Sequence, residues 1–257
     1  MRPLGLGYAG TRKVAWERSM KLGGSRLSAR RSFAPACVAV LLWGAGASGV
    51  AAATVEIKDG NIFLVEGAQR RQLTKSGRDA DAVLAPDGKT VAFTRVGNPQ
   101  SSGMQGDCKS GAQADELRRI RVDGGGDELL VRGQEGKDPK ESLCEFRRKQ
   151  FSSDGRILYV LTPAWATSGA LHAYDTRDKK LGFVMPANDV IVLSACKSQE
   201  YRDNLVVQQH RYFVVAGSYD WYWLYDRTGK REKGPLGDFD GEEAVREAID
   251  AAGLCER

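Results

Sequence analysis

The chain has 257 residues, and its 38 Lys and Arg against 33 Asp and Glu give a formal net charge of +5. The positive excess lies at the N-terminus, because eight of the basic residues and one of the acidic residues precede residue 54. The remaining chain keeps 30 basic and 32 acidic residues, so its net charge is about −2. A nucleic-acid-binding domain needs a basic surface of its own, and this balance therefore excludes nucleic acid as the expected partner.

The first 53 residues have the pattern of a signal peptide. A basic stretch is followed by an uncharged segment, Phe33–Ala53, which ends in small residues with Ala51 and Ala53 at the spacing of a cleavage site. The apolar core, Cys37–Trp43, is too short to span a bilayer. We therefore expect cleavage after Ala53, a periplasmic or secreted mature protein, and no stable membrane anchor after cleavage.

Two alternatives for the N-terminus stay open. The basic stretch is long, and Met20 begins a more usual one, so the true start is expected there or at Met1. Arg30-Arg31-Ser32-Phe33 matches part of a twin-arginine signal, although the ordinary secretory route is favoured. An uncleaved transmembrane anchor is the competing interpretation of the whole segment.

Four cysteines remain in the mature chain: Cys108, Cys144, Cys196 and Cys255. An even number of cysteines in an exported chain predicts two disulfides, for which three pairings exist. Their order along the chain favours Cys108–Cys144 and Cys196–Cys255, since this pairing closes two separate regions. A zinc site is the weaker alternative, because no two of these cysteines are two to four residues apart.

Residues 54–237 have the pattern of an all-β domain. Short runs rich in Val, Ile, Leu, Tyr and Phe alternate with turns of Gly, Asp and Asn. The clearest predicted strands are NIFLVE from Asn61, KTVAFTRV from Lys89, RILYVLT from Arg156, DVIVL from Asp189 and RYFVVAG from Arg211.

The predicted strands repeat as a unit. A strand ends in an acidic turn at Glu66, Asp123, Asp175 and Asp226, at intervals of 57, 52 and 51 residues. Inside the unit, Asp87-Gly88 and Asp154-Gly155 each separate two apolar runs, which is a strong hairpin signal. In the next copy Gln209-His210 takes this place, before RYFVVAG, and we interpret that copy as degraded.

These motifs resemble a known family of repeats. The string from Leu73 to APDGKTVAF is similar to the repeat of TolB-type β-propellers, and QFSSDGRILYV from Gln150 resembles the next copy. The resemblance covers roughly residues 61–230 and implies blades of four antiparallel strands. A propeller scaffold hosts many functions, so the resemblance implies nothing specific about activity.

The expected architecture is a propeller-like stack of about three to four four-stranded antiparallel blades with a C-terminal α-helix. The first full blade begins at Asp81 and is preceded by a half-blade at 54–74. Since propellers usually have at least four blades, a strained ring, an open stack and half of a homodimeric propeller all remain as alternatives.

A helix is predicted within residues 238–257, packed on the same domain. Asp240 is the expected N-cap, with Glu243 completing a capping box. Gly253 is expected to end the helix. An apolar stripe at helical spacing is formed by Ala244, Val245, Ala248, Ile249 and Ala252.

The sequence gives little support for chemistry. His172 lies in a predicted strand and His210 in a predicted turn, and no G-x-S-x-G motif surrounds any serine. The acidic segment Asp238–Glu242 resembles a fragment of a calcium loop, but helix capping explains the same residues. The basic run Arg147–Lys149 is explained equally well by an acidic partner or by a solvated strand end. We therefore expect no catalytic residues, no metal site and no cofactor.

The most unusual segment is the strand Ser218–Asp226. Tyr219, Trp221, Trp223 and Tyr225 alternate along it and share one face. Such a face is the candidate binding surface, because Trp and Tyr dominate binding hot spots. Packing between blades is the alternative, and it is favoured for most of the stripe because large aromatic residues commonly fill cores.

These observations lead to one functional hypothesis and two alternatives. The expectation is an exported, non-catalytic, propeller-like protein that binds another protein in the cell envelope, with an inhibitor or immunity-type protein as one version. The first alternative is an envelope hydrolase or lyase on the same scaffold. The second is a glycan or peptide receptor that uses Tyr219–Tyr225.

Overall fold

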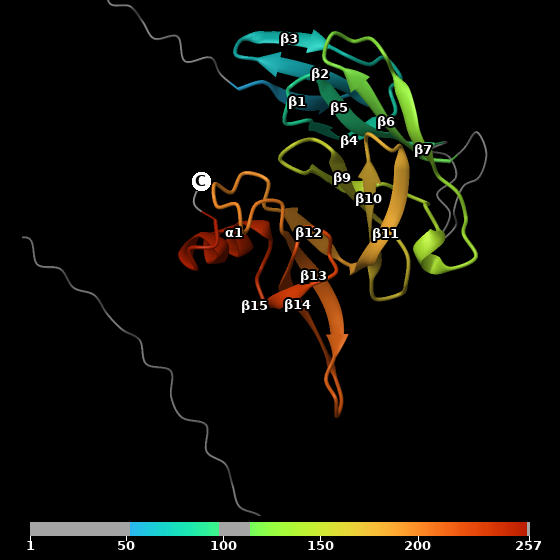
Figure 1. Cartoon of the computed structure of the whole chain (residues 1–257). Coiled ribbons are helices and arrows are strands. Elements are labelled where there is room, and N and C mark those ends of the chain that lie inside the picture. The colour runs from blue at the N-terminus through green and yellow to red at the C-terminus, as the bar shows by residue number, and fades with distance from the viewer. Residues whose placement is uncertain (1–51, 98–113, 256–257) are drawn as a thin grey trace, which may run out of the picture. The chain divides into compact units, whose positions relative to one another are not determined.

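The computed structural model describes residues 52–97 and 114–255 (Figure 1). Residues 1–51 of the predicted signal peptide, the alternative start at Met20 and Cys108 lie outside the described residues. No helix in the two described ranges combines the length and the apolar character that a membrane span requires.

The described residues form four antiparallel sheets in chain order. The first sheet has three strands, and each of the others has four. The strands are β1 (Thr54–Lys58), β2 (Asn61–Glu66), β3 (Gln69–Gln72), β4 (Asp79–Leu84), β5 (Thr90–Arg95), β6 (Glu116–Arg121), β7 (Glu128–Arg132), β8 (Arg147–Phe151), β9 (Ile157–Thr162), β10 (Gly169–Asp175), β11 (Lys180–Ala187), β12 (Asp189–Val192), β13 (Leu205–Tyr212), β14 (Ser218–Tyr225) and β15 (Glu232–Gly237). The expected all-β stack of three to four blades is confirmed.

The predicted repeat unit is confirmed in the second and third sheets. Asp87-Gly88 joins β4 to β5 and Asp154-Gly155 joins β8 to β9, with the two glycines at φ +68° and +69°. This conformation explains why the turns contain glycine. The acidic turn after β10 is held by Asp175, which accepts backbone N–H groups of Arg177 and Asp178. The hydrogen bond from Arg156 is the main reason that the pKa of Asp175 falls to about 2.

The fourth sheet departs from the repeat as we predicted it. Gln209-His210 is not a turn: both residues lie within β13. The connection that corresponds to the Asp-Gly turn is the longer loop between β12 and β13, where Leu193 N–H donates to Asn204 C=O at 2.9 Å. The expected strand RYFVVAG also ends early, at Tyr212, and its remaining residues form the β13–β14 turn.

Successive sheets bury apolar residues between them. One cluster joins the first and second sheets, a second joins the second and third, and a third joins the third and fourth. Their members include Leu64 and Val91, then Leu117 and Val160, then Leu171 and Val207. A sheet covered on both faces can bury its apolar side chains on both sides, as propeller blades do.

The helix α1 (Glu242–Ala251) packs on the fourth sheet. Val245 and Ile249 are buried in a cluster with β12, β13 and β14 residues, as the apolar stripe predicted. The predicted N-cap is wrong: Gly241, at φ +91°, occupies that position and no side chain caps the helix. The first turn is instead held by Glu242, which pairs with Arg246 and with Arg148 of β8.

A disulfide joins Cys196 in the β12–β13 loop to Cys255 after α1. This part of the expected pairing is confirmed. Cys144 is also disulfide-bonded. The Cys196–Cys255 disulfide therefore holds the C-terminal helix against the fourth sheet.

The basic run in β8 is a solvated strand end only at Arg147, which is 55% exposed, whereas Arg148 and Lys149 pair with acids of other elements. The side chain of Lys149 is completely buried, and its ammonium group donates to Asp81 and to Thr94, each at 2.7 Å. Burial lowers the pKa of Lys149 even though Asp81 opposes this effect. Arg148 lies in a bulge at φ +54°, and Asp81 occupies a similar bulge in β4 at φ +45°.

Candidate interaction site

The hairpin of β13 and β14 extends beyond the sheet to which it belongs (Figure 1). β12 pairs with β13 only along Leu205–Gln208, and β15 pairs with β14 only along Tyr222–Tyr225. Residues 209–212 and 218–221 therefore pair only with each other among the described strands. We call residues 209–211 and 219–221 the stalk, and residues 212–218 the tip.

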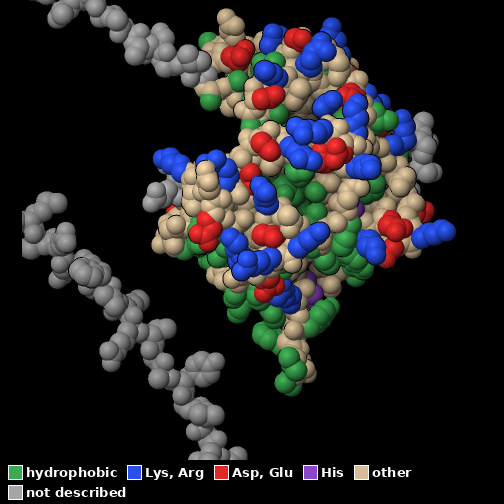
Figure 2. Space-filling model, viewed as in Figure 1, with side chains coloured by type: hydrophobic (Ala, Val, Ile, Leu, Met, Phe, Trp, Pro, Cys, Tyr) green, Lys and Arg blue, Asp and Glu red, His purple; other side chains and the backbone are tan. Residues whose placement is uncertain are grey.

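The tip exposes large apolar side chains to solvent. Tyr212 is 69% exposed, Phe213 54%, Val214 104% and Val215 96%. Figure 2 shows hydrophobic side chains gathered at the end of this hairpin. The turn is closed by the N–H of Phe213, which donates to the C=O of Gly217 at 3.0 Å.

Aromatic side chains run along one face of the stalk into the core. The ring centroids are 4.7 Å apart for Phe213 and Tyr219, 5.0 Å for Tyr219 and Trp221, and 6.5 Å for Trp221 and Trp223. Trp223 is buried between the third and fourth sheets. Because aromatic pairs in such geometries attract each other, this ladder stiffens the stalk and anchors it in the core.

Arg211 strengthens the same face of the stalk. Its guanidinium group lies 3.5 Å from the centre of the Trp223 ring, a cation–π contact. It also donates to Gln209, Tyr225 and Glu232 at 2.6–2.7 Å. Burial would lower the pKa of Arg211, but the hydrogen bond with Glu232 and the nearby negative charges raise it above its ordinary value.

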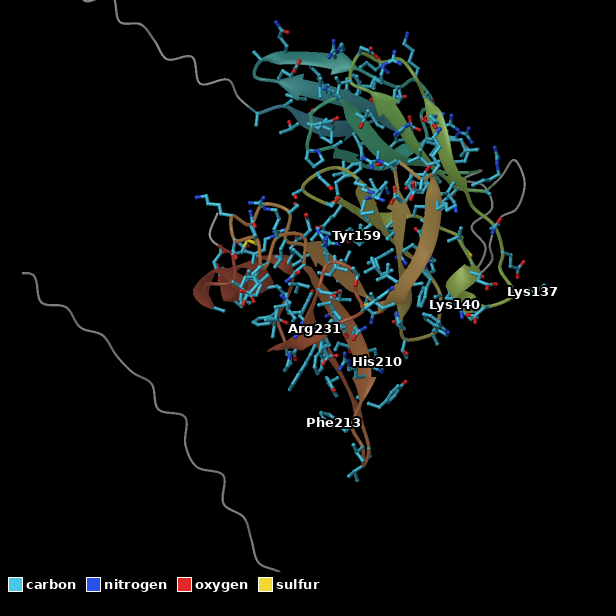
Figure 3. All side chains as sticks on the ribbon, viewed as in Figure 1. Lys137, Lys140, Tyr159, His210, Phe213 and Arg231 are labelled. Carbon is cyan, nitrogen blue, oxygen red and sulfur yellow. A yellow bond between two sulfur atoms is a disulfide. The ribbon has the colours of Figure 1, made fainter. Side chains whose placement is uncertain are left out.

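The opposite face of the stalk carries a second polar pair. His210 Nδ1 lies 2.9 Å from a carboxylate oxygen of Asp220, its cross-strand neighbour. The His210 ring also contacts Tyr212 edge to face, with centroids 5.0 Å apart. Figure 3 shows His210 on the stalk and Phe213 nearer the end of the hairpin. The predicted place of His210 in a turn is therefore wrong.

The structure divides the predicted aromatic stripe into two parts. Tyr219 and Trp221 are half-buried on the stalk, whereas Trp223 and Tyr225 are 8% and 7% exposed in the core. The most exposed apolar residues of the hairpin, Val214 and Val215, were missed because their run has the composition of a strand. The sequence feature that could have indicated this apolar turn is the absence of charged residues from Tyr212 to Tyr219, around Ala216-Gly217.

His172, the other histidine, lies in the third sheet and is closed to solvent. Its Nε2 lies 3.1 Å from the hydroxyl group of Thr162, and both residues are buried. Burial lowers the pKa of His172 to about 4. A substrate in solution does not reach this pair, so it supplies no exposed base and nucleophile.

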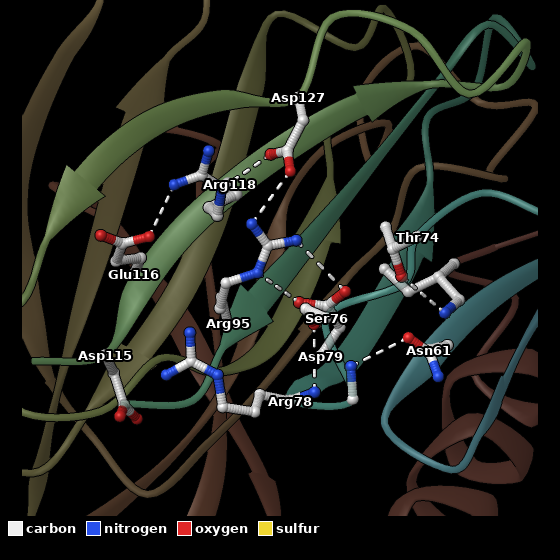
Figure 4. Close-up of polar contacts among 12 residues, drawn as sticks. Asn61, Thr74, Ser76, Arg78, Asp79, Arg95, Asp115, Glu116, Arg118 and Asp127 are labelled. Carbon is white, nitrogen blue, oxygen red and sulfur yellow. Dashed lines mark hydrogen bonds and ion pairs between the residues drawn. The ribbon is translucent and has the colours of Figure 1, made fainter. Parts of the chain in front are cut away.

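The arginine-rich second sheet offers no free cationic surface around its central charges. Arg95 pairs with Asp79 and with Asp127 (Figure 4), at N–O distances of 2.7 and 2.9 Å. Arg118 binds the same Asp127 at 2.7 Å and Glu116 at 2.6 Å. These charges neutralise each other and hold β4 to β7 together. Within the described ranges, no three His, Cys, Asp or Glu side chains converge as metal ligands.

A cavity of about 210 Å³ lies among β4, β8, β12 and α1. Its apolar lining includes Leu84, Phe151 and Ile249. Arg246 is the cation at its edge, and this residue is already paired with Glu242. Gln150, Ser194 and Asp250 also line it. The projecting hairpin is the stronger candidate site because its large apolar side chains are exposed to solvent.

Comparisons with protein-family models and with curated proteins find no match. Among solved structures, TolB from Acinetobacter baumannii is 12% identical with a TM-score of 0.45, and the match covers 74% of this chain and 41% of that one. The β-propeller domain of the Trilobed protease from Pyrococcus furiosus, described with an open velcro topology, is 15% identical with a TM-score of 0.44, covering 71% and 49%. Oligogalacturonate lyase from Vibrio parahaemolyticus is 12% identical with a TM-score of 0.47, covering 73% and 46%.

This chain spans less than half the length of each of these three structures. Three of the four described sheets have four antiparallel strands in chain order, which is the blade arrangement that the repeats predicted. The resemblance predicted from the repeats is thus confirmed at the level of the fold.

Proposed function

We propose that this protein is exported and that it binds another protein through the tip of the β13–β14 hairpin, without performing chemistry. The observation that carries the proposal is the exposure of Tyr212, Phe213, Val214 and Val215 on a stiff stalk. Soluble monomers rarely expose contiguous apolar patches larger than a few hundred Å², and the largest such patch on a protein is often an interaction site.

The energetics favour a partner that covers the tip. Moving one fully exposed valine side chain into an apolar environment stabilises the complex by about 1.5–3 kcal/mol. Val214 and Val215 both offer this gain. Aromatic residues such as Tyr212 are common hot spots of interfaces.

Two features support export. The first is the signal-peptide pattern at residues 1–53, which ends at the start of the β domain. The second is the disulfide between Cys196 and Cys255, since structural disulfides persist mainly in oxidising compartments.

The test uses the full chain, exported by its own N-terminal segment and purified with its disulfides intact. The protein is immobilised and exposed to an envelope extract of the producing cells, and retained proteins are identified by mass spectrometry and counted against the bait. We expect one protein retained near one copy per bait and rebinding after purification. An exported protein that retains no partner at this level contradicts the proposal.

A further inference from the structure

The two valine side chains at the tip do not take part in the packing of the fold. Phe213 stacks on Tyr219 and so belongs partly to the ladder that stiffens the stalk. Val214 and Val215 are fully exposed, at 104% and 96%. Since neither valine supports the fold, their apolar character is best explained by what they meet outside this chain.

The shape of the tip requires a concave partner. It is a narrow turn on a two-stranded stalk, exposed on all sides. Two aromatic and two valine side chains offer on the order of 500 Å², against about 800 Å² per partner in a standard interface. A flat surface would cover one side of the tip, whereas a pocket would cover all sides and also reach the stalk. Two copies of such a convex tip cannot enclose each other, which argues against a second copy.

The charges behind the tip argue against a lipid surface. Peripheral membrane binding relies on unpaired Lys or Arg beside the apolar residues. Here Arg211, the arginine of the stalk, is paired with Glu232 at 2.6 Å, and His210 Nδ1 lies 2.9 Å from a carboxylate oxygen of Asp220. An apolar centre surrounded by paired polar groups is the arrangement of protein–protein interfaces, with their hydrophobic core and polar rim.

The stalk lowers the cost of insertion. The ladder from Phe213 to Trp223 and the contacts of Arg211 hold the hairpin in one shape before binding. A preorganised element loses less conformational entropy when it binds than a flexible loop does.

We propose, resting on the proposed function above, that the tip enters an apolar pocket of a folded partner protein as a plug, with Phe213, Val214 and Val215 as its anchors. The polar pairs of the stalk then lie at the rim of that pocket. A plug of this kind occupies the pocket and excludes other ligands from it, which is the geometry of an inhibitor.

The experiment compares two aspartate substitutions in the full exported chain. Val214→Asp places a charge at the tip, and Leu129→Asp places one on β7, where Leu129 is 38% exposed in a different sheet. Both variants are checked for an unchanged melting temperature. The protein retained from the envelope extract by the wild type is then titrated against all three.

We expect Leu129→Asp to bind like the wild type and Val214→Asp to bind at least about a hundredfold more weakly, because a charge must be buried without a partner. A photo-crosslinking phenylalanine analogue at position 215 should label residues that line an apolar pocket of the partner. Crosslinks confined to a flat polar surface would overturn the plug while leaving binding through the tip intact. Equal binding by wild type and Val214→Asp would overturn the plug and also the tip as the binding site, while a partner would still be retained elsewhere on the protein. Retention of no protein by the wild type would overturn both.

Two further measurements distinguish a protein pocket from the two other surfaces that could cover the tip, namely a lipid membrane and a second copy of the chain. Vesicles of phosphatidylethanolamine and phosphatidylglycerol should not retain the wild type in flotation. Sedimentation should show a monomer at micromolar concentration. Flotation or dimerisation that Val214→Asp abolishes would replace the plug with a membrane anchor or with a self-association surface.

Discussion

The third and fourth sheets have the same strand order but differ in their connections. In the third sheet a tight Asp154-Gly155 turn joins the first two strands, and the central hairpin folds back so that Trp165 contacts Phe183 at 6.2 Å. In the fourth sheet the first connection is a long loop that carries Cys196, and the central hairpin projects with an exposed tip. The blade framework is therefore kept, while new surface is built in the connections, where variation costs least.

Replacing Trp223, the buried end of the aromatic ladder, should have the largest effect on stability. Trp223 packs among residues of both sheets, including Tyr159 and Leu171. We expect Trp223→Ala to lower the free energy of unfolding by about 3–5 kcal/mol, as for other buried aromatic truncations. Denaturant unfolding measures this loss, and hydrogen exchange should show that residues 209–221 lose protection first.

Trp223→Phe is the matched control for this prediction. It keeps an aromatic ring beneath Arg211 and removes the indole N–H, which is buried without a hydrogen-bond partner in the described chain. We expect a loss below about 1.5 kcal/mol, as for other conservative core changes. If both variants unfold like the wild type, the ladder does not anchor the stalk.

The disulfide of the fourth sheet should give the second largest effect. Cys196 and Cys255 are 59 residues apart and hold α1 against the sheet. We expect the double variant Cys196→Ser and Cys255→Ser to lose about 2–4 kcal/mol. Thermal unfolding without reductant measures it, which keeps the disulfide of Cys144 intact in both proteins. An unchanged melting temperature would show that packing of Val245 and Ile249 alone retains the helix.

The third sheet contains His172, a residue whose protonation should lower stability in acid. The fourth sheet has no such residue at the corresponding position. Burial lowers the pKa of His172 to about 4 in the folded protein. Below the unfolded pKa of about 6.5 the unfolded chain binds a proton that the native state rejects. Stability is therefore full above about pH 6.5 and falls as the pH drops toward 4, by on the order of 2–3 kcal/mol.

His172→Gln isolates this effect. Glutamine retains a polar group near Thr162 but does not titrate. The difference in unfolding free energy between wild type and variant should change between pH 7 and pH 4, while carboxylates contribute equally to both. A difference that stays constant over this range would mean that His172 has the same pKa in the folded and the unfolded protein.

The sequence predicted the regular sheets better than the modified one, for a physical reason. Asp87-Gly88 and Asp154-Gly155 are turns that need a positive φ, so their residue types are restricted and visible. The β12–β13 loop has no Asp-Gly pair, since its residue at positive φ is Asp203, at +63°, and the prediction placed the turn at Gln209-His210 instead. The disulfide of Cys196 was predicted from order alone because so few pairings exist.

Only part of the candidate site could be predicted from the sequence. Alternation placed Tyr219 and Trp221 on one face with Trp223, but which of them is buried depends on the third sheet, far away in sequence. Val214 and Val215 have strong strand propensity, and propensity does not distinguish a paired strand from an exposed turn. What decides exposure is where β12 and β15 stop pairing.

The substitution with the smallest expected effect on stability gives the sharpest comparison of the two central hairpins, β9–β10 and β13–β14. Val214 contacts solvent on all sides, so Val214→Ser should change the free energy of unfolding by less than about 0.5 kcal/mol. Trp165→Ala, at the turn of the folded-back hairpin, should cost more, because it removes contacts with Phe183 and half-buried apolar area worth about 1 kcal/mol. Both values come from denaturant titration under one condition. A larger loss for Val214→Ser than for Trp165→Ala would mean that the tip folds back on the protein in solution, and its exposure would then no longer indicate a partner.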